Sequence, residues 1–416
     1  MSPYRFDYDK CQLIYSPNPV DVGKLSSCIT TKPIREVTPS VVKGFFDDCH
    51  HIIFEVTERC NLECEYCAYG KNYVQPKTRP LNRREAMSWT TAKTILDYYI
   101  DIWNNKGDNT LPISINFYGG EPLTNFNLIS KITDYILNNK PEELQVIFHV
   151  TTNAIFLKRY INWLMDHDFH ISVSVDGDER SNEYRKDKNG CGSFKAVINT
   201  LDYIRDNYPI YFKSRFMFQS VLNSNSTIET IESFFKRRFG KKTEFIPISR
   251  NHLAVKNSID RISGNWRKLN DNDATLNHTN IIKRFTDYFF DDYLDFFNPK
   301  FIVAPGTCTP FSSRVFFSAS GFIYACEKVD LNNPLGQIEG NKLCIDFDQI
   351  ALRYSKMFTC YSEYCNSCLF LKACKHCLAC EEGGIDYNGP CKEYKRIDKE
   401  LINEVISFIR NNPCNI

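Results

Sequence analysis

The placement of cysteine constrains the fold of this chain more than any other feature. Eighteen of the 416 residues are cysteine, and three of them stand close together at Cys60, Cys64 and Cys67. Only Cys191 lies between this triplet and Cys308, after which cysteine becomes frequent again. Unrelated buried thiols would not leave so long a gap between two clusters. The distribution therefore predicts two sulfur-rich sites in two domains.

The rest of the composition excludes several classes of protein. A hydrophobic share of 43% and a charged share of 24% are typical of a globular chain rather than a disordered one. The 51 Lys and Arg residues nearly balance the 50 Asp and Glu residues, which leaves no broad basic field for nucleic acid. There is no signal-peptide core at the start and no run near the roughly 18 apolar residues of a membrane span. We expect a cytoplasmic protein without nucleic-acid or membrane contacts, whose reduced thiols serve as ligands rather than as disulfides.

Apolar runs of strand length alternate with runs at helical spacing from residue 50 to about residue 250. The predicted strands are His50–Val56, Ile113–Tyr118, Gln145–Thr151, His170–Val175, Tyr211–Phe218 and Thr243–Ile248. The predicted helices are Ala92–Trp103, Asn127–Asn138, Leu157–His167, Phe194–Tyr208 and Ser226–Phe239. Strands and helices in this order predict an α/β fold with a parallel sheet. Six units rather than eight favour an open, partial barrel.

Polar residues follow the first four predicted strands directly. The cysteine triplet follows the first strand, Gly119-Gly-Glu-Pro122 the second, Thr151-Thr-Asn153 the third and Ser174-Val-Asp-Gly177 the fourth. In a β/α barrel the loops at this edge of the sheet build the active site. We therefore expect these four segments to meet at one site.

The triplet Cys60-x3-Cys64-x2-Cys67 offers three thiolates on one short loop. A structural zinc site needs four ligands, and no second pair of cysteines lies near this loop in the sequence. Three thiolates suit a 4Fe–4S cluster in which one iron stays open for an external ligand.

The strand, the triplet Cys60-Asn-Leu-Glu-Cys64-Glu-Tyr-Cys67 and the following Gly119-Gly-Glu-Pro122 together resemble the radical S-adenosylmethionine (SAM) superfamily. The resemblance implies a partial six-unit β/α barrel whose open iron chelates SAM. It also implies reductive cleavage of SAM to a 5′-deoxyadenosyl radical that takes hydrogen from an unactivated C–H bond, with the protein supplying orientation and exclusion of water.

The resemblance carries roles for individual residues. Cys60, Cys64 and Cys67 would ligate the SAM-cleaving cluster. The residues implied to contact SAM are Tyr66 (adenine), Gly119 and Gly120 (close backbone approach), Glu121 (amino group), Asn153 and Ser174 (ribose and methionine parts) and Arg185 (carboxylate). An arginine suits the last role because its fork binds a carboxylate through two hydrogen bonds. A solvated surface arginine is the competing interpretation of Arg185, and a simple turn that of Gly-Gly-Glu-Pro.

The C-terminal cysteines resemble the SPASM extension of radical SAM enzymes, over about residues 305–395. This resemblance implies two auxiliary 4Fe–4S clusters, and with the first site three in all. By order, Cys365, Cys368, Cys374 and Cys391 would hold the outer cluster, and Cys308 and Cys326 with Cys377, Cys380 or both the inner one. Eight thiolates would complete two four-cysteine sites. A zinc ribbon built from Cys365, Cys368, Cys377 and Cys380 is the alternative.

The resemblance to SPASM enzymes, and to their peptide-maturase members over residues 308–328, implies a maturase that acts on a ribosomally made precursor peptide. The expected outcome is a thioether or carbon–carbon crosslink or an epimerisation, with a flavodoxin or ferredoxin as implied electron donor. Asp176 is a candidate base, although an Asp-Gly turn at the strand end explains it more simply. The alternatives are a sulfatase maturase that makes formylglycine, and a zinc- or cluster-binding protein without turnover.

The expected domains follow the same order along the chain. Residues 1–49 form an N-terminal extension, in which Asp9–Ser16 is a candidate strand of a β-hairpin for peptide contact; an extension without a role in peptide contact is the alternative. Residues 50–250 form the barrel, 251–304 a helical bridge, 305–395 the SPASM domain and 396–416 a C-terminal helix.

Overall fold

A computed structural model describes most of the barrel region and parts of the remainder. The described residues are 4–7, 12–15, 19–21, 37–80, 84–105, 111–248, 259, 261–262, 308–329 and 331–365. The chain divides into two compact units, of which the larger comprises residues 39–269 and 310–350 and the smaller residues 1–38, 270–309 and 351–416.

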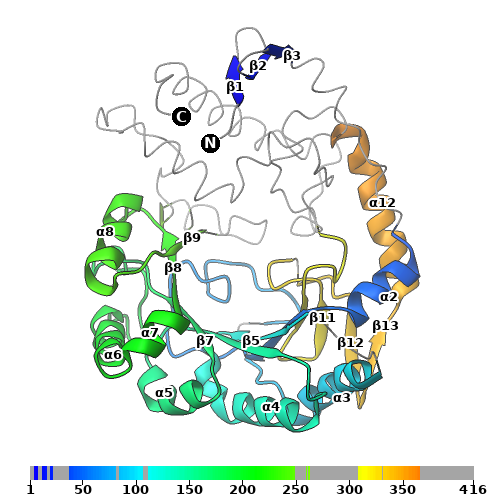
Figure 1. Ribbon diagram of the computed structural model, residues 1–416, viewed down its shortest axis with the longest axis horizontal. Helices are drawn as coiled ribbons and strands as arrows, with labels where there is room; N and C mark the ends of the chain where they lie inside the picture. The colour runs from blue at the N-terminus through cyan, green and yellow to red at the C-terminus, as the bar shows by residue number, and fades with distance from the viewer. Residues whose placement is uncertain are drawn as a thin grey trace. The chain divides into compact units, whose positions relative to one another are not determined.

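The larger unit contains one ten-stranded sheet with the order β13-β12-β11-β10-β4-β5-β6-β7-β8-β9. Its six central strands are β4 (His51–Thr57), β5 (Ile113–Gly119), β6 (Val146–Thr152), β7 (His170–Ser174), β8 (Phe216–Leu222) and β9 (Glu244–Pro247). Each pairs in parallel with the next in chain order. This arrangement confirms the predicted α/β class and the partial, six-unit β/α barrel (Figure 1).

The sheet continues on its other side into residues far along the chain. Strand β10 (Val315–Phe317) pairs in parallel with β4, so that Phe316 lies beside Ile53. The remaining strands, β11 (Phe322–Tyr324), β12 (Gly336–Glu339) and β13 (Lys342–Ile345), pair antiparallel to their neighbours. Strands β10 to β13 therefore belong to the same sheet as β4, the strand that precedes the cysteine triplet.

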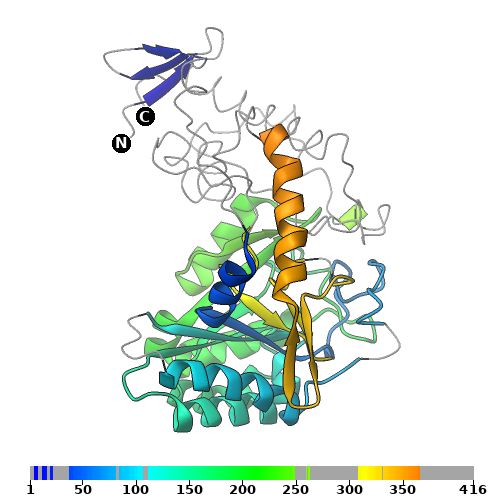
Figure 2. The same cartoon turned by 90° about the vertical axis from the view of Figure 1, so that its right-hand side faces the viewer.

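Helices connect the parallel strands and cover the outer face of the sheet (Figure 1). They are α3 (Trp89–Asn105), α4 (Phe126–Asn139), α5 (Leu157–Asp166), α6 (Phe194–Asn207), α7 (Pro209–Arg215) and α8 (Ile228–Phe239), with η1 (Pro122–Asn125) before α4 and α2 (Pro39–Asp47) before β4. Figure 2 shows the same helical layer from the side. Helix α8 has the sharpest sequence signals, because Thr227 caps its first turn and Gly240 ends it in a left-handed conformation.

The two faces of the sheet differ in polarity, and the difference follows from strand periodicity. In β5, Ile113, Ile115 and Phe117 are buried on the helical side. Phe117 belongs to a row of stacked rings, with Phe54 of β4 on one side and Phe169, just before β7, on the other. The alternating residues, among them Asn116, face the interior of the barrel. Because the aromatic rings are buried on the helical side, the side chains available for a site are those on the opposite face of the sheet.

One predicted strand is wrong over most of its length. Residues 211–215 of the predicted strand Tyr211–Phe218 lie in α7, and β8 begins only at Phe216. Pro209 stands at the first helical position, where its fixed φ angle favours a helix. Tyr211 and Phe212 are buried in α7, so their apolar character satisfies a helix as well as a strand.

The smaller unit contains a three-stranded antiparallel sheet of β1 (Tyr4–Asp7), β2 (Gln12–Tyr15) and β3 (Pro19–Asp21). β2 lies inside the candidate strand Asp9–Ser16, and it pairs on both sides rather than in a simple hairpin. Helix α12 (Phe347–Cys365) begins in the larger unit and continues into the smaller one. The predicted bridge, apart from residues 259 and 261–262, and the predicted C-terminal helix lie outside the described residues.

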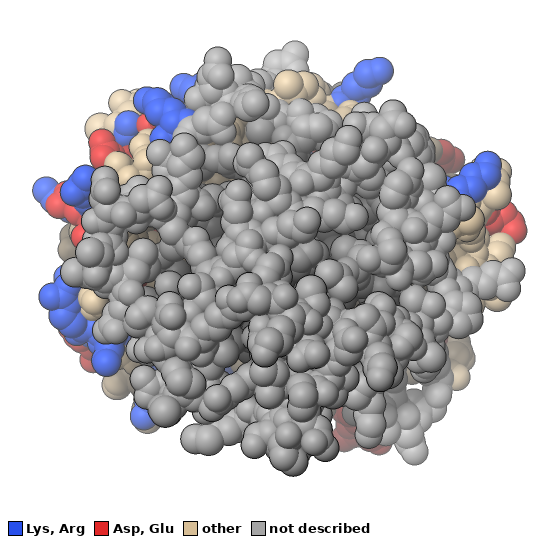
Figure 3. Space-filling model, turned by 90° about the horizontal axis from the view of Figure 1, so that it is seen from above, with Lys and Arg blue, Asp and Glu red and all other residues tan. Residues whose placement is uncertain are grey.

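The distribution of charge on the surface agrees with the near-zero net charge of the sequence. In the coloured part of the surface in Figure 3, acidic and basic side chains are interspersed rather than gathered by sign. Within the described ranges, no helix has both the length and the apolar character that crossing a bilayer requires.

Candidate active site

The three cysteines of the triplet lie on the loop that leaves β4. Their thiols are free and partly buried. The backbone N–H of Cys67 donates to the carbonyl oxygen of Cys64 at 3.1 Å, and the N–H of Gly70 donates to that of Cys67 at 2.8 Å. These tight turns fold the loop back on itself, which brings the three thiols to the carboxyl edge of the sheet.

The three thiols share one cation in their electrostatic surroundings. Burial raises the pKa of Cys60 to about 12 and also raises the pKa values of Cys64 and Cys67. The buried guanidinium of Arg185 lowers all three pKa values and so partly offsets burial. A fixed positive charge beside three thiols stabilises an anionic thiolate cluster at this place.

The donor set fits a 4Fe–4S cluster better than a single ion. Among the described residues, no three His, Cys, Asp or Glu side chains are arranged to surround one metal ion. A cluster does not need such convergence, because each thiolate binds a different iron. Three free thiols on one loop beside the cation of Arg185 would supply the three ligands that leave one iron open.

Gly119 and Gly120 lie where the chain leaves β5, and both are confined by the loop after β4. Gly119 has a φ of +138°, and a Cβ there would lie 2.1 Å from the carbonyl oxygen of Thr57. A Cβ on Gly120 would lie 2.4 Å from the carbonyl oxygen of Arg59. Both positions require glycine for close backbone approach. In the described chain this approach is to the cysteine loop itself, and an approach to SAM stays a prediction.

Glu121 is fully buried and its carboxylate accepts three hydrogen bonds. One oxygen accepts from Thr152 Oγ1 at 2.8 Å and from the backbone N–H of Leu123 at 3.1 Å. The other accepts from the backbone N–H of Asn153 at 2.8 Å. Burial raises the pKa of Glu121 to about 7 against the opposing effect of these bonds. Glu121 thus joins the ends of β5 and β6, and its contact with the SAM amino group stays a prediction.

Asn153 connects this corner to the cysteine loop. Its Nδ2 donates to Asn61 Oδ1 at 2.8 Å and lies 3.9 Å from Cys60 Sγ. Ser174 ends β7 and is half-buried. The structure therefore brings Cys60, Asn153 and Glu121 together at one corner, as expected from the order of the strands.

Arg185, Asp176 and Tyr66 form a buried triad at the same edge of the sheet. Arg185 Nη2 donates to Asp176 Oδ1 at 2.8 Å, and the Tyr66 hydroxyl donates to Oδ2 of the same carboxylate. The backbone N–H of Val221 also donates to Asp176 Oδ1 at 3.0 Å. Both oxygens of Asp176 are thus engaged, which favours a positioning role over that of a free base. Arg185 is buried rather than solvated, and its Nε has no hydrogen-bond partner among the described residues.

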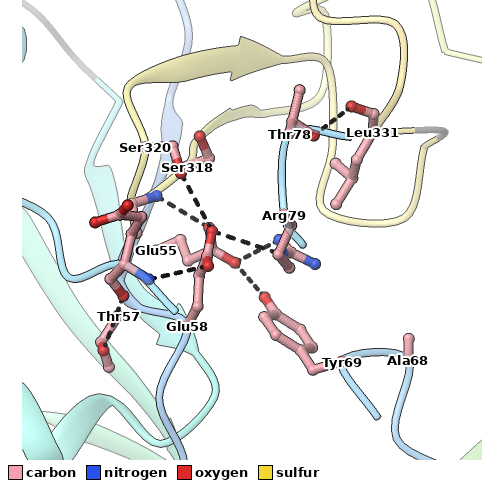
Figure 4. Close-up of polar contacts among 12 residues, drawn as sticks. Glu55, Thr57, Glu58, Ala68, Tyr69, Thr78, Arg79, Ser318, Ser320 and Leu331 are labelled. Carbon is pink, nitrogen blue, oxygen red and sulfur yellow. Dashed lines mark hydrogen bonds and ion pairs between the residues drawn. The ribbon is translucent and has the colours of Figure 1, made fainter. Parts of the chain in front are cut away.

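A second buried arginine went undetected by the sequence patterns. Arg79 lies in the loop after the cysteines and pairs with Glu55, near the end of β4, at 2.5 Å (Figure 4). Neither residue belongs to a recognisable motif. The one signal in the sequence is Glu55 itself, a charged residue inside an otherwise apolar strand.

The predicted auxiliary ligands are described only in part. Cys308 is exposed, and Cys326 is partly buried with its thiol 3.1 Å from Glu327 Oε2. Cys365 ends α12 without a described side chain. The remaining predicted ligands, Cys368, Cys374, Cys377, Cys380 and Cys391, lie outside the described residues.

Comparisons with known proteins agree with this geometry. The model of the radical SAM superfamily matches residues 54–235. An uncharacterized protein of Methanocaldococcus jannaschii is 31% identical over 230 residues, which cover 54% of this chain and 72% of that protein. The radical SAM cyclopropyl synthase TigE of Paramaledivibacter caminithermalis is 22% identical over 85% of this chain and 74% of its own length.

Two further similarities extend over nearly complete proteins. The cysteine-type anaerobic sulfatase-maturating enzyme of Clostridium perfringens is 22% identical over 86% of this chain and 98% of its own length. The solved structure of native anSMEcpe with bound AdoMet superposes with a TM-score of 0.56 at 18% identity, covering 87% of this chain and 99% of that one. The chain belongs to the radical SAM superfamily and is an enzyme that uses SAM and a 4Fe–4S cluster.

Proposed function

We propose that this enzyme is a cytoplasmic maturase that takes hydrogen from a ribosomally made precursor peptide and leaves a thioether or carbon–carbon crosslink or an epimerised residue. The observation that carries the proposal is the extent of the similarity to TigE, which covers 85% of this chain whereas the family model ends at residue 235. The similarity thus includes much of the region after the barrel.

Two polar side chains on the barrel strands lack hydrogen-bond partners in the described structure. When bound, the cluster and SAM supply a 5′-deoxyadenosyl radical. Asn116 Oδ1 and Ser172 Oγ are buried, and neither has a hydrogen-bond partner in the described part of the chain. A buried polar atom without a partner is costly, and an ordered water is the ordinary means of satisfying it.

The proposal includes the two auxiliary clusters of the SPASM region. Cys308 and Cys326 with Cys377, Cys380 or both would hold the inner cluster, and Cys365, Cys368, Cys374 and Cys391 the outer one. Complete protein ligation would make both clusters electron conduits, fed by a flavodoxin or ferredoxin. Eight candidate thiolates for two four-cysteine sites support this arrangement.

The first experiment tests SAM cleavage and iron content. Reconstituted protein, reduced with dithionite and given SAM without oxygen, is expected to form 5′-deoxyadenosine and to hold about twelve irons per chain. The Cys60→Ala variant should lose the product, whereas Cys191→Ala, which changes an exposed thiol away from the triplet, should retain it. If the wild-type protein forms no 5′-deoxyadenosine, the proposed maturase function, which depends on SAM cleavage, is contradicted. An iron content of about four per chain would contradict the two auxiliary clusters and would remain consistent with a single SAM-cleaving cluster in the barrel.

The second experiment identifies the product. Anaerobic co-expression with a short open reading frame beside the gene, followed by mass spectrometry, should show loss of two hydrogens for each crosslink. An epimerisation leaves the mass unchanged and is detected by chiral analysis of the hydrolysed peptide. A peptide unchanged in both measurements contradicts the proposal for that substrate.

A sulfatase maturase is the second candidate function. It is favoured by the match to the Clostridium perfringens enzyme over 98% of that protein. The structure of anSMEcpe has also been solved with a bound peptide, Cp18Cys. Here a cysteine-containing sulfatase peptide should lose its cysteine sulfur and gain a carbonyl that reacts with a hydrazide. A sulfatase gene beside this one would favour the second candidate, and a short peptide gene the first.

A further inference from the structure

Three segments of the larger unit meet at a buried cluster of charged side chains. Glu55 and Glu58 come from the end of β4, Arg79 from the loop after the cysteines, and Ser320 from the turn between β10 and β11 (Figure 4). Glu55 is 0%, Glu58 3% and Arg79 5% exposed. Burying two carboxylates and one guanidinium carries a large desolvation cost, so this cluster is a poor device for stability alone.

Glu55 contacts all the other segments of the cluster. Its Oε1 accepts from Arg79 Nη2 at 2.5 Å and also from the Tyr69 hydroxyl. Its Oε2 accepts from the backbone N–H of Ala319 at 2.9 Å. One carboxylate thus joins β4, the loop after the cysteines and the β10–β11 turn.

Arg79 is held in one orientation by its neighbours. Its guanidinium carbon lies 3.9 Å from the centre of the Tyr69 ring. Its Nε lies 3.7 Å from Glu58 Oε1 and makes no hydrogen bond in the described structure. Stacking on an aromatic ring combined with pairing to a carboxylate restricts a guanidinium more than either contact alone.

The residues just before Arg79 extend the same junction. Thr78 Oγ1 donates to the carbonyl oxygen of Leu331 at 2.8 Å. The backbone N–H of Lys77 donates to Asn332 Oδ1 at 3.2 Å. The loop after the cysteines is therefore attached at several points to the segment that follows β10.

The two sides of this junction carry cysteines with different expected roles. Tyr69 follows Cys67 by two positions, and its carbonyl oxygen accepts a hydrogen bond from Arg84. Cys326 follows β11 by two positions. A contact that fixes Tyr69 and Arg79 against the β10–β11 hairpin also fixes the segment of Cys67 relative to that of Cys326.

We propose that Arg79, paired with Glu55 and stacked on Tyr69, is a positioning residue that holds the loop of the SAM-cleaving cluster against the β10–β11 hairpin and sets the charge around that cluster. This inference rests on the proposed SAM chemistry and assigns residues that stabilise its site. Outer residues of this kind commonly tune a metal centre through charge and orientation. Removal of the cation should make the cluster harder to reduce, and removal of the anion Glu55 should make it easier.

The test is a redox titration of the reconstituted holoenzyme, followed by electron paramagnetic resonance (EPR) of the reduced SAM-binding cluster. Arg79→Gln should shift its midpoint potential to more negative values, and Glu55→Gln should shift it to more positive values. Arg79→Lys, which keeps the charge but not the planar fork, should shift it less than Arg79→Gln. The matched control, Arg215→Gln, removes a half-buried arginine that is likewise paired with a carboxylate, that of Asp168, and should leave the potential unchanged.

The signs of the two shifts decide the outcome. General loosening of the site would move both variants in the same direction, and shifts of the same sign or unchanged potentials overturn the inference. If Arg79→Gln does not retain its iron, Glu55→Gln and Arg79→Lys decide in its place. In that case the inference is supported when the midpoint potential of Glu55→Gln shifts to more positive values and that of Arg79→Lys shifts to more negative values by a smaller amount than in Glu55→Gln. Any other pair of results overturns it.

Hydrogen exchange supplies a readout that is independent of the cluster potential. Glu55→Gln should accelerate amide exchange in residues 68–80 and in residues 319–332 together, and acceleration in one segment alone overturns the junction. A wild-type EPR signal that does not change when SAM is added would instead contradict the proposed SAM chemistry. The two failures are therefore distinguishable.

Discussion

Strand β7 has an aspartate two positions before its start and another two positions after its end, and each pairs with an arginine. At the amino edge Asp168 pairs with Arg215 at 2.6 and 2.7 Å, with side chains that are 67% and 32% exposed. At the carboxyl edge Asp176 pairs with Arg185 at 2.8 Å, with side chains that are 0% and 8% exposed. The same chemical pair thus exists in water at one end of a strand and away from water at the other.

The difference between the two pairs lies in their exposure to water, which decides how much each pair depends on its protein surroundings. The exposed pair has the better, two-bond geometry, yet solvent screens it and it contributes little. The buried pair has lost its hydration and depends entirely on its protein partners. Those partners include Tyr66 in the cysteine loop, so the buried pair links the barrel to the predicted cluster.

The largest effect is expected when the buried pair is broken. Arg185→Gln leaves the carboxylate of Asp176 buried without its cation, which should lower the free energy of unfolding by about 3–5 kcal/mol. The measurement is anaerobic chemical denaturation of the holoenzyme. Iron content should fall as well, because the cation beside the three thiols is lost.

A double variant tests whether this cost arises from the pair. Adding Asp176→Asn to Arg185→Gln removes the unpaired charge, so the two changes together should cost less than the sum of the single changes. Additive costs would mean that the two residues act separately. That result would contradict the role given to the pair.

A smaller effect, dependent on pH, is expected from Glu121 at the same edge. Its pKa of about 7 in the folded protein exceeds the ordinary value of 4.5. Between these values the folded state holds more protons than the unfolded state, so stability should fall by about 3 kcal/mol as pH rises from 4.5 to about 7. Glu121→Gln should flatten this part of the profile, whatever its effect on the absolute stability. An unchanged slope in the variant would assign the pH dependence to other groups.

His149, in the middle of β6, should give the opposite slope, and a weaker one. Burial beside His170 lowers the pKa of His149 from 6.5 to about 4. Its neutral form is retained in the folded protein, so stability should fall as pH drops from 6.5 towards 4, by about 1–2 kcal/mol after allowance for partial exposure. His149→Gln should reduce the loss below pH 6.5 and leave the profile above it unchanged. An identical acid profile in the variant would contradict this assignment.

The fold could be predicted where the burial of one face of a strand or helix produces a periodic spacing of apolar residues in the sequence. Strands with one buried face and helices with one apolar stripe place the six central strands in the correct order. Residues 209–215 lack such a trace, because a short apolar run suits a buried helix as well as a strand. The addition of β10 beside β4 was not predictable either, since pairing between distant segments leaves no local pattern.

The residues of the site likewise divide into those with a local sequence pattern and those that meet only in the folded chain. Cys60, Cys64 and Cys67 could be predicted as cluster ligands because the spacing of ligands along a loop is a local property, and their ligand role stays a prediction. The contact between Glu55 and Ala319 joins residues 264 positions apart, and no motif records it. Arg185 was identifiable only through the family resemblance, and its pairing with Asp176 appears only in the folded chain.

The smallest effect is expected from the exposed pair, and it tests whether position rather than residue type decides the energetics. Arg215→Gln removes the same kind of side chain as Arg185→Gln and likewise leaves an aspartate without its cation. Because water rehydrates Asp168, the loss in unfolding free energy should be about 0–1 kcal/mol and should shrink further in high salt. Thermal denaturation of both arginine variants at low and high salt makes the comparison. A loss at Arg215 as large as that at Arg185 would show that hydration does not separate the two ends of β7.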